Sequence, residues 1–358
     1  MIHASGPDQG IQRNHATDFA PGQSDIIGLT TDSTLKIDAG NRAHSPPDQP
    51  VFIANNTSDG SSAQLRASIR SSIELTDVWL IDNSSRASNG VRLLNSDLTM
   101  THSPDGSCSP EWGLGGCSRI SGNFKSESNG ISTVLALELI AASDGPRDAI
   151  IERTIIADNS APSGSAELFR VHSNPDLATL TLDSVLIAGN QAWGLFHLRS
   201  DSVVNMGWST LVGNSSPGSL GNIFFSLEGP ATLNLYSSIL WQPESAPQIE
   251  MFSFSDPATL ALADCLVVHD ADEVIDENPA SINQVTDDDP MFVDAANGDY
   301  RVPLDSPAVA CDNSMLGNPL DLGGYQRGVE PWAGSAPVYT AGAWSAAAAD
   351  LIFSDRFE

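Results

Sequence analysis

The stretch Ala178-Thr-Leu-Thr-Leu-Asp-Ser-Val-Leu-Ile-Ala-Gly-Asn190 recurs along this chain of 358 residues. Related text occurs at residues 202–214, 231–243 and 258–270, and similar endings lie upstream. Eight such endings, called landmarks below, are Asn56, Asn83, Asn123, Asn159, Asn190, Asn214, Pro243 and Asp270. They are spaced 24 to 40 residues apart, with short β-type runs in each interval. Such spacing is typical of a solenoid.

Apolar residues recur at alternate positions before each landmark. The residue three positions before the landmark is aliphatic in all eight repeats, and the residues five, eight and ten positions before it are mostly small or apolar. Alternate residues of a strand share one face, so the pattern predicts strands whose inward side chains build a core. We therefore expect an all-β fold, a right-handed single-stranded parallel β-helix of about eight coils with a C-terminal capping segment.

The period divides the chain into four segments. Residues 1–28 lack periodicity and are expected to be a poorly ordered polar segment. Residues 29–286 are expected to form the β-helix, with a loop insertion at 101–117 that lengthens the third coil. The period stops after that, and residues 287–332 are expected to cap the last coil, which would otherwise expose its core and its strand edge. Residues 333–358 are rich in Ala, Gly and Ser and are expected to be a tail.

The composition is strongly acidic. The chain has 45 Asp and Glu residues against 16 Lys and Arg residues, a formal net charge of −29. Binding to nucleic acid or to an anionic membrane surface is therefore disfavoured. No apolar run reaches the ~18 residues that a membrane helix needs. Residues 1–10 have neither the basic region nor the apolar region of a signal peptide.

The four cysteines give two predictions. Cys108 and Cys117 bracket a Gly-rich loop, and a disulfide between them is favoured over two exposed thiols, which would be prone to oxidation. That disulfide would indicate an oxidising compartment. Cys265 stands five residues before a landmark, where the side chain is expected to enter the core. It could equally be a buried thiol or the partner of Cys311, and both alternatives stay open.

Asparagine occupies six of the eight landmarks. A turn between stacked strands needs a residue near the left-handed region, which Asn tolerates, and stacked Asn side chains can form a ladder of amide hydrogen bonds. We expect these residues to be structural. A second structural pattern is a stripe of apolar residues at positions expected to face outward, which should be covered by residues 287–345 or, alternatively, by a partner or a second copy. The stripe comprises Ile155, Leu186, Ile239, Trp241, Leu266 and Val268.

A further strand follows four of the landmarks, at residues 168–172, 195–199, 224–228 and 251–255. Coils of a β-helix stack ~4.8 Å apart, so equivalent side chains should form columns on the outer surface. One column is predicted to hold Arg170, His197, Ser226 and Ser253. The next is predicted to hold His172, Arg199, Glu228 and Ser255.

The sequence near the C-terminus resembles a known C-terminal module. Asp289-Pro-Met-Phe-Val-Asp294, Gly298-Asp-Tyr300, Ser306-Pro-Ala308 and Asp321-Leu-Gly-Gly-Tyr325 match a module found at the end of bacterial extracellular β-helix proteins of the choice-of-anchor type. With its coils, the chain resembles the right-handed parallel β-helix proteins of the pectin-lyase-like superfamily. The resemblance implies a secreted or cell-surface location. It implies no particular reaction, because that superfamily includes lyases, hydrolases, esterases and adhesins.

The candidates for chemistry are few. A polysaccharide lyase of this fold needs a base beside acidic Ca²⁺ ligands. Asp287, Asp288 and Asp289 form a solvated acidic turn or a weak Ca²⁺ site, so Ca²⁺ is the one cofactor left open. The paired Asp residues and Gly-His-Gly motif of galacturonases do not occur. The residues that could act as catalytic or ligand-binding groups are Arg170, His172, His197, Arg199 and Glu228.

The sequence therefore favours a secreted or cell-surface protein, a monomer that binds polysaccharide or a cell-surface glycan without catalysis, as in adhesion. The alternative is a polysaccharide lyase or glycoside hydrolase that acts on an acidic glycan through the outer face of the strand following each landmark.

Overall fold

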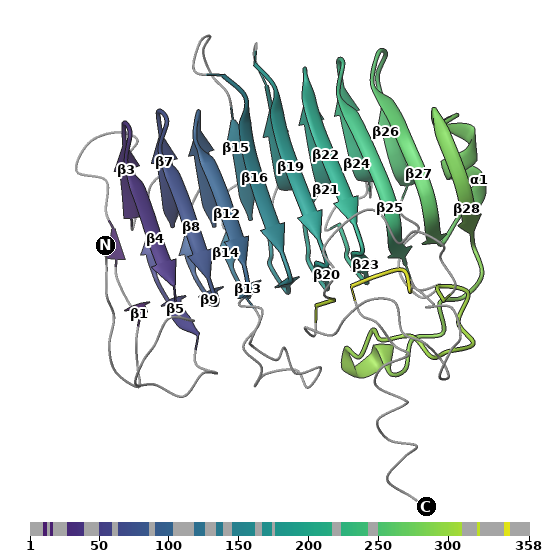
Figure 1. Cartoon of the computed structure of the whole chain (residues 1–358). Helices are drawn as coiled ribbons and strands as arrows, with labels where there is room; N and C mark the ends of the chain where they lie inside the picture. Colours follow the sequence, from purple (N-terminus) through teal and green to yellow (C-terminus); the bar gives the residue numbers. More distant parts are fainter. Residues whose placement is uncertain are drawn as a thin grey trace, which may run out of the picture.

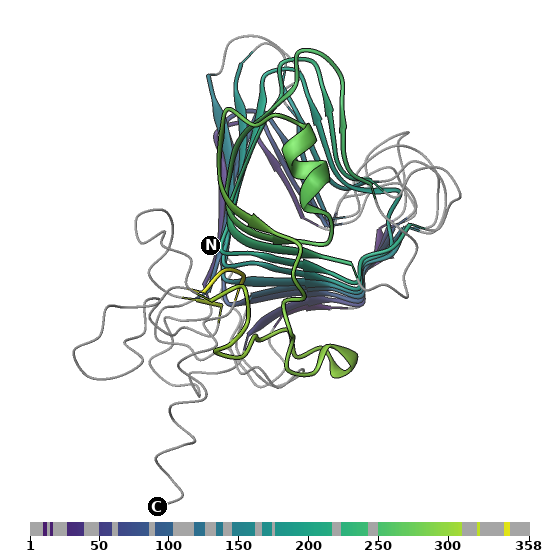
Figure 2. The ribbon, with the colours of Figure 1, turned by 90° about the vertical axis from the view of Figure 1, so that its right-hand side faces the viewer.

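The computed structural model shows a parallel β-helix, which confirms the predicted fold class (Figure 1). Each coil passes through three sheets, and equivalent strands of successive coils pair in parallel. Seen along the stack, the sheets enclose one interior (Figure 2). The structure describes residues 10–12, 15–16, 27–38, 50–58, 64–85, 90–102, 118–125, 134–138, 145–161, 167–173, 176–216, 223–242, 250–309, 321–322 and 340–343.

Sheet 1 and sheet 2 meet at a corner, and two long strands, β25 (Thr232–Trp241) and β27 (Thr259–Val268), run through both. Sheet 1 also holds β4 (Thr34–Asp38), β8 (Ser72–Thr76), β12 (Asp97–Thr101), β16 (Arg147–Glu152), β19 (Ala178–Asp183) and β22 (Ser202–Gly207), and β28 (Ser281–Thr286) ends the stack. Sheet 2 also holds β1 (Gly10–Gln12), β5 (Val51–Ala54), β9 (Val78–Ile81), β13 (Ser118–Ser121), β17 (Thr154–Ala157), β20 (Leu186–Ala188) and β23 (Thr210–Val212).

Sheet 3 is formed by the strands that follow the landmarks. Its members are β3 (Ile27–Thr30), β7 (Leu65–Ser68), β11 (Val91–Leu94), β15 (Leu135–Glu138), β18 (Glu167–His172), β21 (Gly194–Arg199), β24 (Ile223–Glu228) and β26 (Glu250–Phe254). A small fourth sheet holds β2 (His15–Ala16), β6 (Thr57–Ser58), β10 (Ser84–Ser85) and β14 (Phe124–Lys125). Helix α1 (Ala271–Asp276) lies across the interior at the C-terminal end and buries Val274, and a 3-10 turn, η1 (Ala295–Asn297), follows later (Figure 2).

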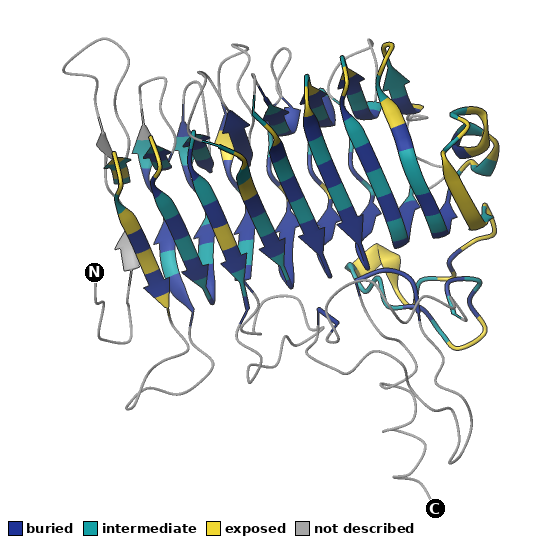
Figure 3. Cartoon of the chain, turned by 45° about the horizontal axis from the view of Figure 1, so that its top comes forward, coloured by how far each residue is buried: buried dark blue, intermediate teal, exposed yellow. Residues whose placement is uncertain are grey.

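The predicted register is confirmed for seven of the eight landmarks. Burial alternates along the strands, as a one-sided core requires (Figure 3). On either side of the predicted insertion, β12 and β13 pair with the neighbouring coils, while the insertion itself stays a prediction. The aliphatic residues three before these landmarks stack in one fully buried column of Ile53, Leu80, Ile120, Ile156, Ile187, Leu211 and Leu240.

The prediction for the eighth landmark is wrong by one residue. A β-bulge beside Leu233 inserts one extra residue into β27, so Leu240 faces Val268 rather than Val267. Leu266 and Val268 therefore enter the core instead of facing outward. Cys265 turns outward, against the expectation, and is buried in a cluster with Ile239 and Val302. Cys265 is disulfide-bonded.

The partner of Cys265 lies outside the described residues, as do Cys108, Cys117 and Cys311, so both predicted pairings stay predictions. The loop at 103–117 and the end of the chain at 344–358 also lie outside them. Within residues 1–28, β1 and β2 pair with β5 and β6, so this segment contributes short strands that its aperiodic sequence did not indicate.

The asparagine ladder is confirmed. Nδ2 and the backbone N–H of Asn159 both donate to Oδ1 of Asn190, at 2.9 and 3.0 Å. The same pair of bonds links the six landmarks Asn56, Asn83, Asn123, Asn159, Asn190 and Asn214, all of them completely buried. The left-handed residue is not the Asn itself but the one before it: Asn55, Asp82, Gly122, Asp158, Gly189 and Gly213.

The apolar stripe on sheet 2 is covered by the chain's own C-terminal segment, as predicted. Ile155 and Leu186 pack with Leu322 and Ala343, and Phe292 and Tyr300 border this cluster. Ile239 packs with Val302, Ala308 and Ala341, with Trp241 at the edge. The described part of the cap therefore lies back along the outside of the coils rather than only on their end. Residues 340–343 pack there too, although they were expected to belong to the tail.

Candidate binding face on sheet 3

The outward residues of sheet 3 form the two predicted columns. Strand pairing places Arg170 beside His197, His197 beside Ser226, and Ser226 beside Ser253. It also places Arg199 between His172 and Glu228. Toward the N-terminal end, the columns continue through Arg66, Arg92 and Ala136, and through Ser68, Leu94 and Glu138.

Stacked rings hold these strands from the inside. The centroids of Phe169 and Phe196 lie 4.7 Å apart, and those of Phe196 and Phe225 lie 4.8 Å apart, with nearly parallel planes. Phe252 extends the stack by one coil. Close packing of large rings restricts movement of the backbone between them. The outward side chains therefore project from a rigid support.

His197 is the centre of the charged cluster on this face. Its Nδ1 lies 3.2 Å from Oε1 of Glu167, and its Nε2 lies 3.4 Å from Oε1 of Glu228, at ion-pair distance but without a hydrogen bond. Arg199 Nε lies 2.9 Å from Oε2 of the same Glu228. Arg170 Nη2 lies 3.4 Å from Oε2 of Glu167. Four of the five predicted residues thus form one connected network.

The carboxylate of Glu167 is the buried member of this network, with a side chain that is only 4% exposed. Burial alone would raise its pKa, but the hydrogen bond with His197 and the charges of Arg170 and His197 together lower it. Glu167 is therefore ionised at neutral pH. A buried carboxylate of this kind fixes the orientation of the imidazole ring that it contacts.

His172, the fifth predicted residue, lies in the second column next to Arg199. Desolvation lowers its pKa, and the charges of Arg199, Arg170 and His197 lower it further, while Glu138 acts in the opposite direction. His172 is therefore uncharged at neutral pH. It can both donate and accept a hydrogen bond in that state.

Sequence reasoning missed an ion pair on the same face. Arg92 donates from Nη2 and Nε to Oε2 of the nearly buried Glu138, at 3.0 and 3.1 Å. Glu138 lies in β15, whose alternating run Val134-Leu-Ala-Leu-Glu-Leu-Ile140 marks it as a strand of this sheet. Counting from that run would have placed Glu138 in the column of His172.

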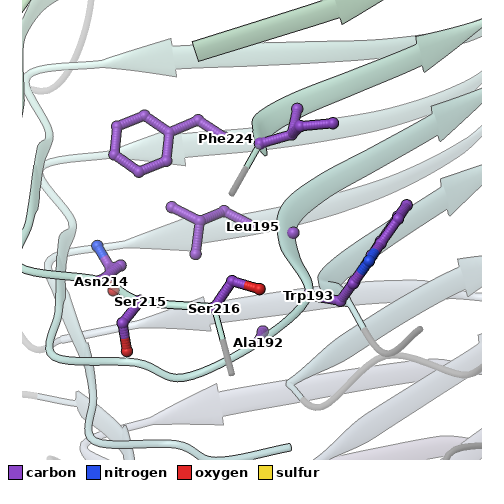
Figure 4. A pocket seen from close by; sticks show the side chains of 9 residues that line it. Ala192, Trp193, Leu195, Asn214, Ser215, Ser216 and Phe224 are labelled. Carbon is purple, nitrogen blue, oxygen red and sulfur yellow. The ribbon is translucent and has the colours of Figure 1, made fainter. Parts of the chain in front are cut away.

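A small hollow lies where β21 and β24 begin (Figure 4). It is shallow and open to solvent, with room for about one water molecule (about 10 Å³). Trp193 stands on one side, with Leu195 and Phe224 on the other and Ser215 and Ser216 beside them (Figure 4). Trp193 directly precedes β21, the strand that carries His197 and Arg199. An indole beside hydroxyl groups therefore adjoins the charged face.

A second buried cluster lies at the corner between sheets 1 and 2. His102 bonds through Nδ1 to the Asp77 carboxylate of the preceding coil. The fully buried Arg153 donates from Nε to the backbone oxygen of Asp321 at 3.1 Å and from Nη1 to that of His102. Because Asp321 belongs to the cap, this cluster joins the cap to the coils.

The side chains of the predicted acidic turn bond to residues two positions away in the sequence. Asp287, Asp288 and Asp289 are exposed. Asp288 accepts from the Thr286 hydroxyl at 2.8 Å, and Asp289 accepts from the N–H of Met291. No group of three or more His, Cys, Asp or Glu side chains that could hold a metal ion occurs within the part of the chain that the structure describes.

Fold and surface together define a parallel β-helix with a rigid, charged outer face on sheet 3. No protein-family model, no curated protein and no solved structure matches this chain. No helix among the described residues is long and apolar enough to cross a membrane.

Proposed function

We propose that this chain is a secreted or cell-surface β-helix of the pectin-lyase-like kind that binds a polysaccharide without cleaving it. The binding face is the outer surface of sheet 3, and Arg170, His172, His197 and Arg199 are its contact residues. A polysaccharide is a long ligand, and columns of polar side chains that run from coil to coil suit it better than a compact ligand.

The observation that carries this proposal is the ion-pair network around His197. Glu167 and Glu228 hold His197, Arg170 and Arg199 in place. These side chains therefore lose little conformational entropy when a ligand binds. Charged groups that are already paired favour positioning and recognition over proton transfer. The hollow beside Trp193 adds an aromatic surface of the kind that packs against a sugar ring.

A second candidate function is a polysaccharide lyase or glycoside hydrolase at the same residues. One contact favours it: the Glu167 carboxylate bonds to Nδ1 of His197, an arrangement that orients a histidine to act as a general base through Nε2. Nε2 lies near Glu228, which is half-exposed and accessible to a ligand. In this alternative, His197 would be the base.

The test is a panel of neutral and uronate-containing polysaccharides, with and without Ca²⁺, examined by affinity electrophoresis and by the ultraviolet absorbance of unsaturated products. Retardation in the gel without new absorbance or new reducing ends supports binding alone. Product formation that His197→Ala abolishes would replace the proposal with the enzyme. Absence of both retardation and product across the panel would refute both functions.

A further inference from the structure

The C-terminal end of the stack has an open strand edge. β28 pairs with β27 along one side, and among the described strands no other element pairs with it. Figure 1 shows β28 as the outermost strand at this end, with α1 beside it. An unpaired edge presents backbone N–H and C=O groups that can bond to another strand.

Two core columns reach the surface at this edge. Ile282 pairs with the buried Ala263, and Val285 pairs with the buried Leu266, so both continue columns that are inside every earlier coil. Ile282 is nevertheless 45% exposed, because no further coil covers it, and Ile275 of α1 is 51% exposed. The first four residues of β28 are all exposed (Figure 3). The end therefore lacks the cover that one more strand would supply.

The surroundings of the edge are strongly acidic. Residues 250–309 contain 14 Asp and Glu residues and a single Arg. Asp276 and Glu277 precede β28, and Asp287, Asp288 and Asp289 follow it directly, so acidic side chains flank both of its ends. Burial raises the pKa of Glu277, and the neighbouring Asp276 and Glu250 raise it further, as expected where like charges crowd.

We infer that the edge of β28 binds an extended, basic segment of a partner protein, which adds to the stack as a further parallel strand. Every strand pair described in this stack is parallel, and a strand that continues the stack takes the same direction. Apolar side chains of the segment would cover Ile282 and Val285, and Lys or Arg at its ends would face Glu277 and Asp287. Main-chain bonds provide affinity in this mode, and side chains provide specificity.

The charge of the chain disfavours a second copy of it as the partner that binds this edge. Each copy has a formal net charge of −29, and residues 27–38 of its first coil carry Asp32 and Asp38 against Lys36. Stacking that coil onto the acidic end would bring like charges together. The edge belongs to sheet 1 and the proposed polysaccharide face to sheet 3, and the two use different residues, so the two inferences stand or fall separately.

The probe is a fluorescent peptide with alternating Val and Thr between two pairs of lysines. Its controls are a version with proline at alternate positions, which keeps the charge but loses backbone donors, and a version with glutamate in place of lysine. Anisotropy should show binding of the lysine peptide, at least about tenfold weakening with proline, and none with glutamate. Hydrogen exchange should show protection of residues 281–286 in the complex.

Two variants test the site on the protein. Ile282→Lys and the triple variant Asp287→Asn, Asp288→Asn, Asp289→Asn should each weaken binding several-fold, and the triple variant should also reduce its dependence on salt. A matched triple, Asp38→Asn, Asp148→Asn, Asp201→Asn, removes equal charge from exposed sites elsewhere and should bind like the wild type. Equal binding of the proline peptide, failure of the lysine peptide, or a dimer that Ile282→Lys dissolves would each overturn the proposal.

Discussion

Oε1 of Glu167 lies 3.2 Å from Nδ1 of His197, although the two residues belong to successive coils and are 30 positions apart. Parallel pairing of β18 with β21 sets Glu167 beside Gly194 and Arg170 beside His197, so Glu167 and His197 lie on neighbouring strands of one sheet. The contact is thus a product of the coil register, and it determines how the charged face behaves with pH.

Replacing Glu167 by Gln should remove a pH-dependent part of the stability. The folded-state pKa of Glu167 is lowered, so its stabilising effect is complete above the unfolded value of 4.5 and is lost as the pH falls through the folded value. At ~pH 7, urea unfolding of Glu167→Gln should show a loss of about 2 kcal/mol, and the difference should shrink as the pH is lowered through the folded-state pKa.

The control for this change is Glu74→Gln. Glu74 also forms an ion pair, with Lys36 at 3.1 Å, but both side chains are about half-exposed. The loss there should stay within about 0.5 kcal/mol over the same range of pH. A Glu167→Gln variant as stable as the wild type near neutral pH would show that the network contributes nothing to the fold.

Removing one side chain of the asparagine ladder should strongly lower the free energy of unfolding. Asn159→Ala removes the acceptor of two bonds from Asn123. The buried backbone N–H of Asn123 then has no acceptor there, and its Nδ2 keeps only the bond to the backbone oxygen of Leu80. The expected loss is about 3 kcal/mol in the free energy of unfolding. Asn205→Ala is the matched control, because Asn205 accepts a similar amide bond from Asn234 on the outer face of sheet 1, where water can replace it. Similar losses for the two variants would argue against the ladder.

Glycine is required at position 207 because the Tyr236 ring leaves no room for a side chain, and not because of its backbone conformation. A Cβ atom at this position would lie 1.9 Å from Cε2 of Tyr236 in the next coil. Gly207→Ala should therefore cost about 2 kcal/mol or more in thermal or urea unfolding. In a Tyr236→Ala background, the same substitution should cost much less, and the double-mutant cycle measures the difference. Additive losses would mean that the ring moves aside freely.

The fold could be predicted from sequence because every coil has the same spacing between its inward apolar residues and its landmark. Ile53, Ile120 and Ile187 occupy one column, and their spacing from Asn56, Asn123 and Asn190 is constant. The register failed only where the repeat itself is irregular. An extra residue in β27 changes the face of every side chain that follows, and Cys265 was therefore assigned to the wrong side.

The candidate site could be predicted only in part. Its columns follow from the coil length, so Arg170, His172, His197, Arg199 and Glu228 were found together. Which of them pair depends on rotamers and burial, and the sequence does not contain this information in any local pattern. For the same reason, the sequence does not single out Glu167, although its buried carboxylate contacts both His197 and Arg170.

The most direct test of the central claim is the affinity for a polysaccharide that the panel identifies, measured for the wild type, for Arg199→Ala with His197→Ala, and for a control on sheet 1. The control changes Thr181 and Asn205 to Ala, two residues that are neighbours on the opposite outer face. Binding on sheet 3 predicts a loss of tenfold or more, about 1.4 kcal/mol, for the sheet 3 variant and none for the control. Unchanged affinity in a folded sheet 3 variant would contradict the account.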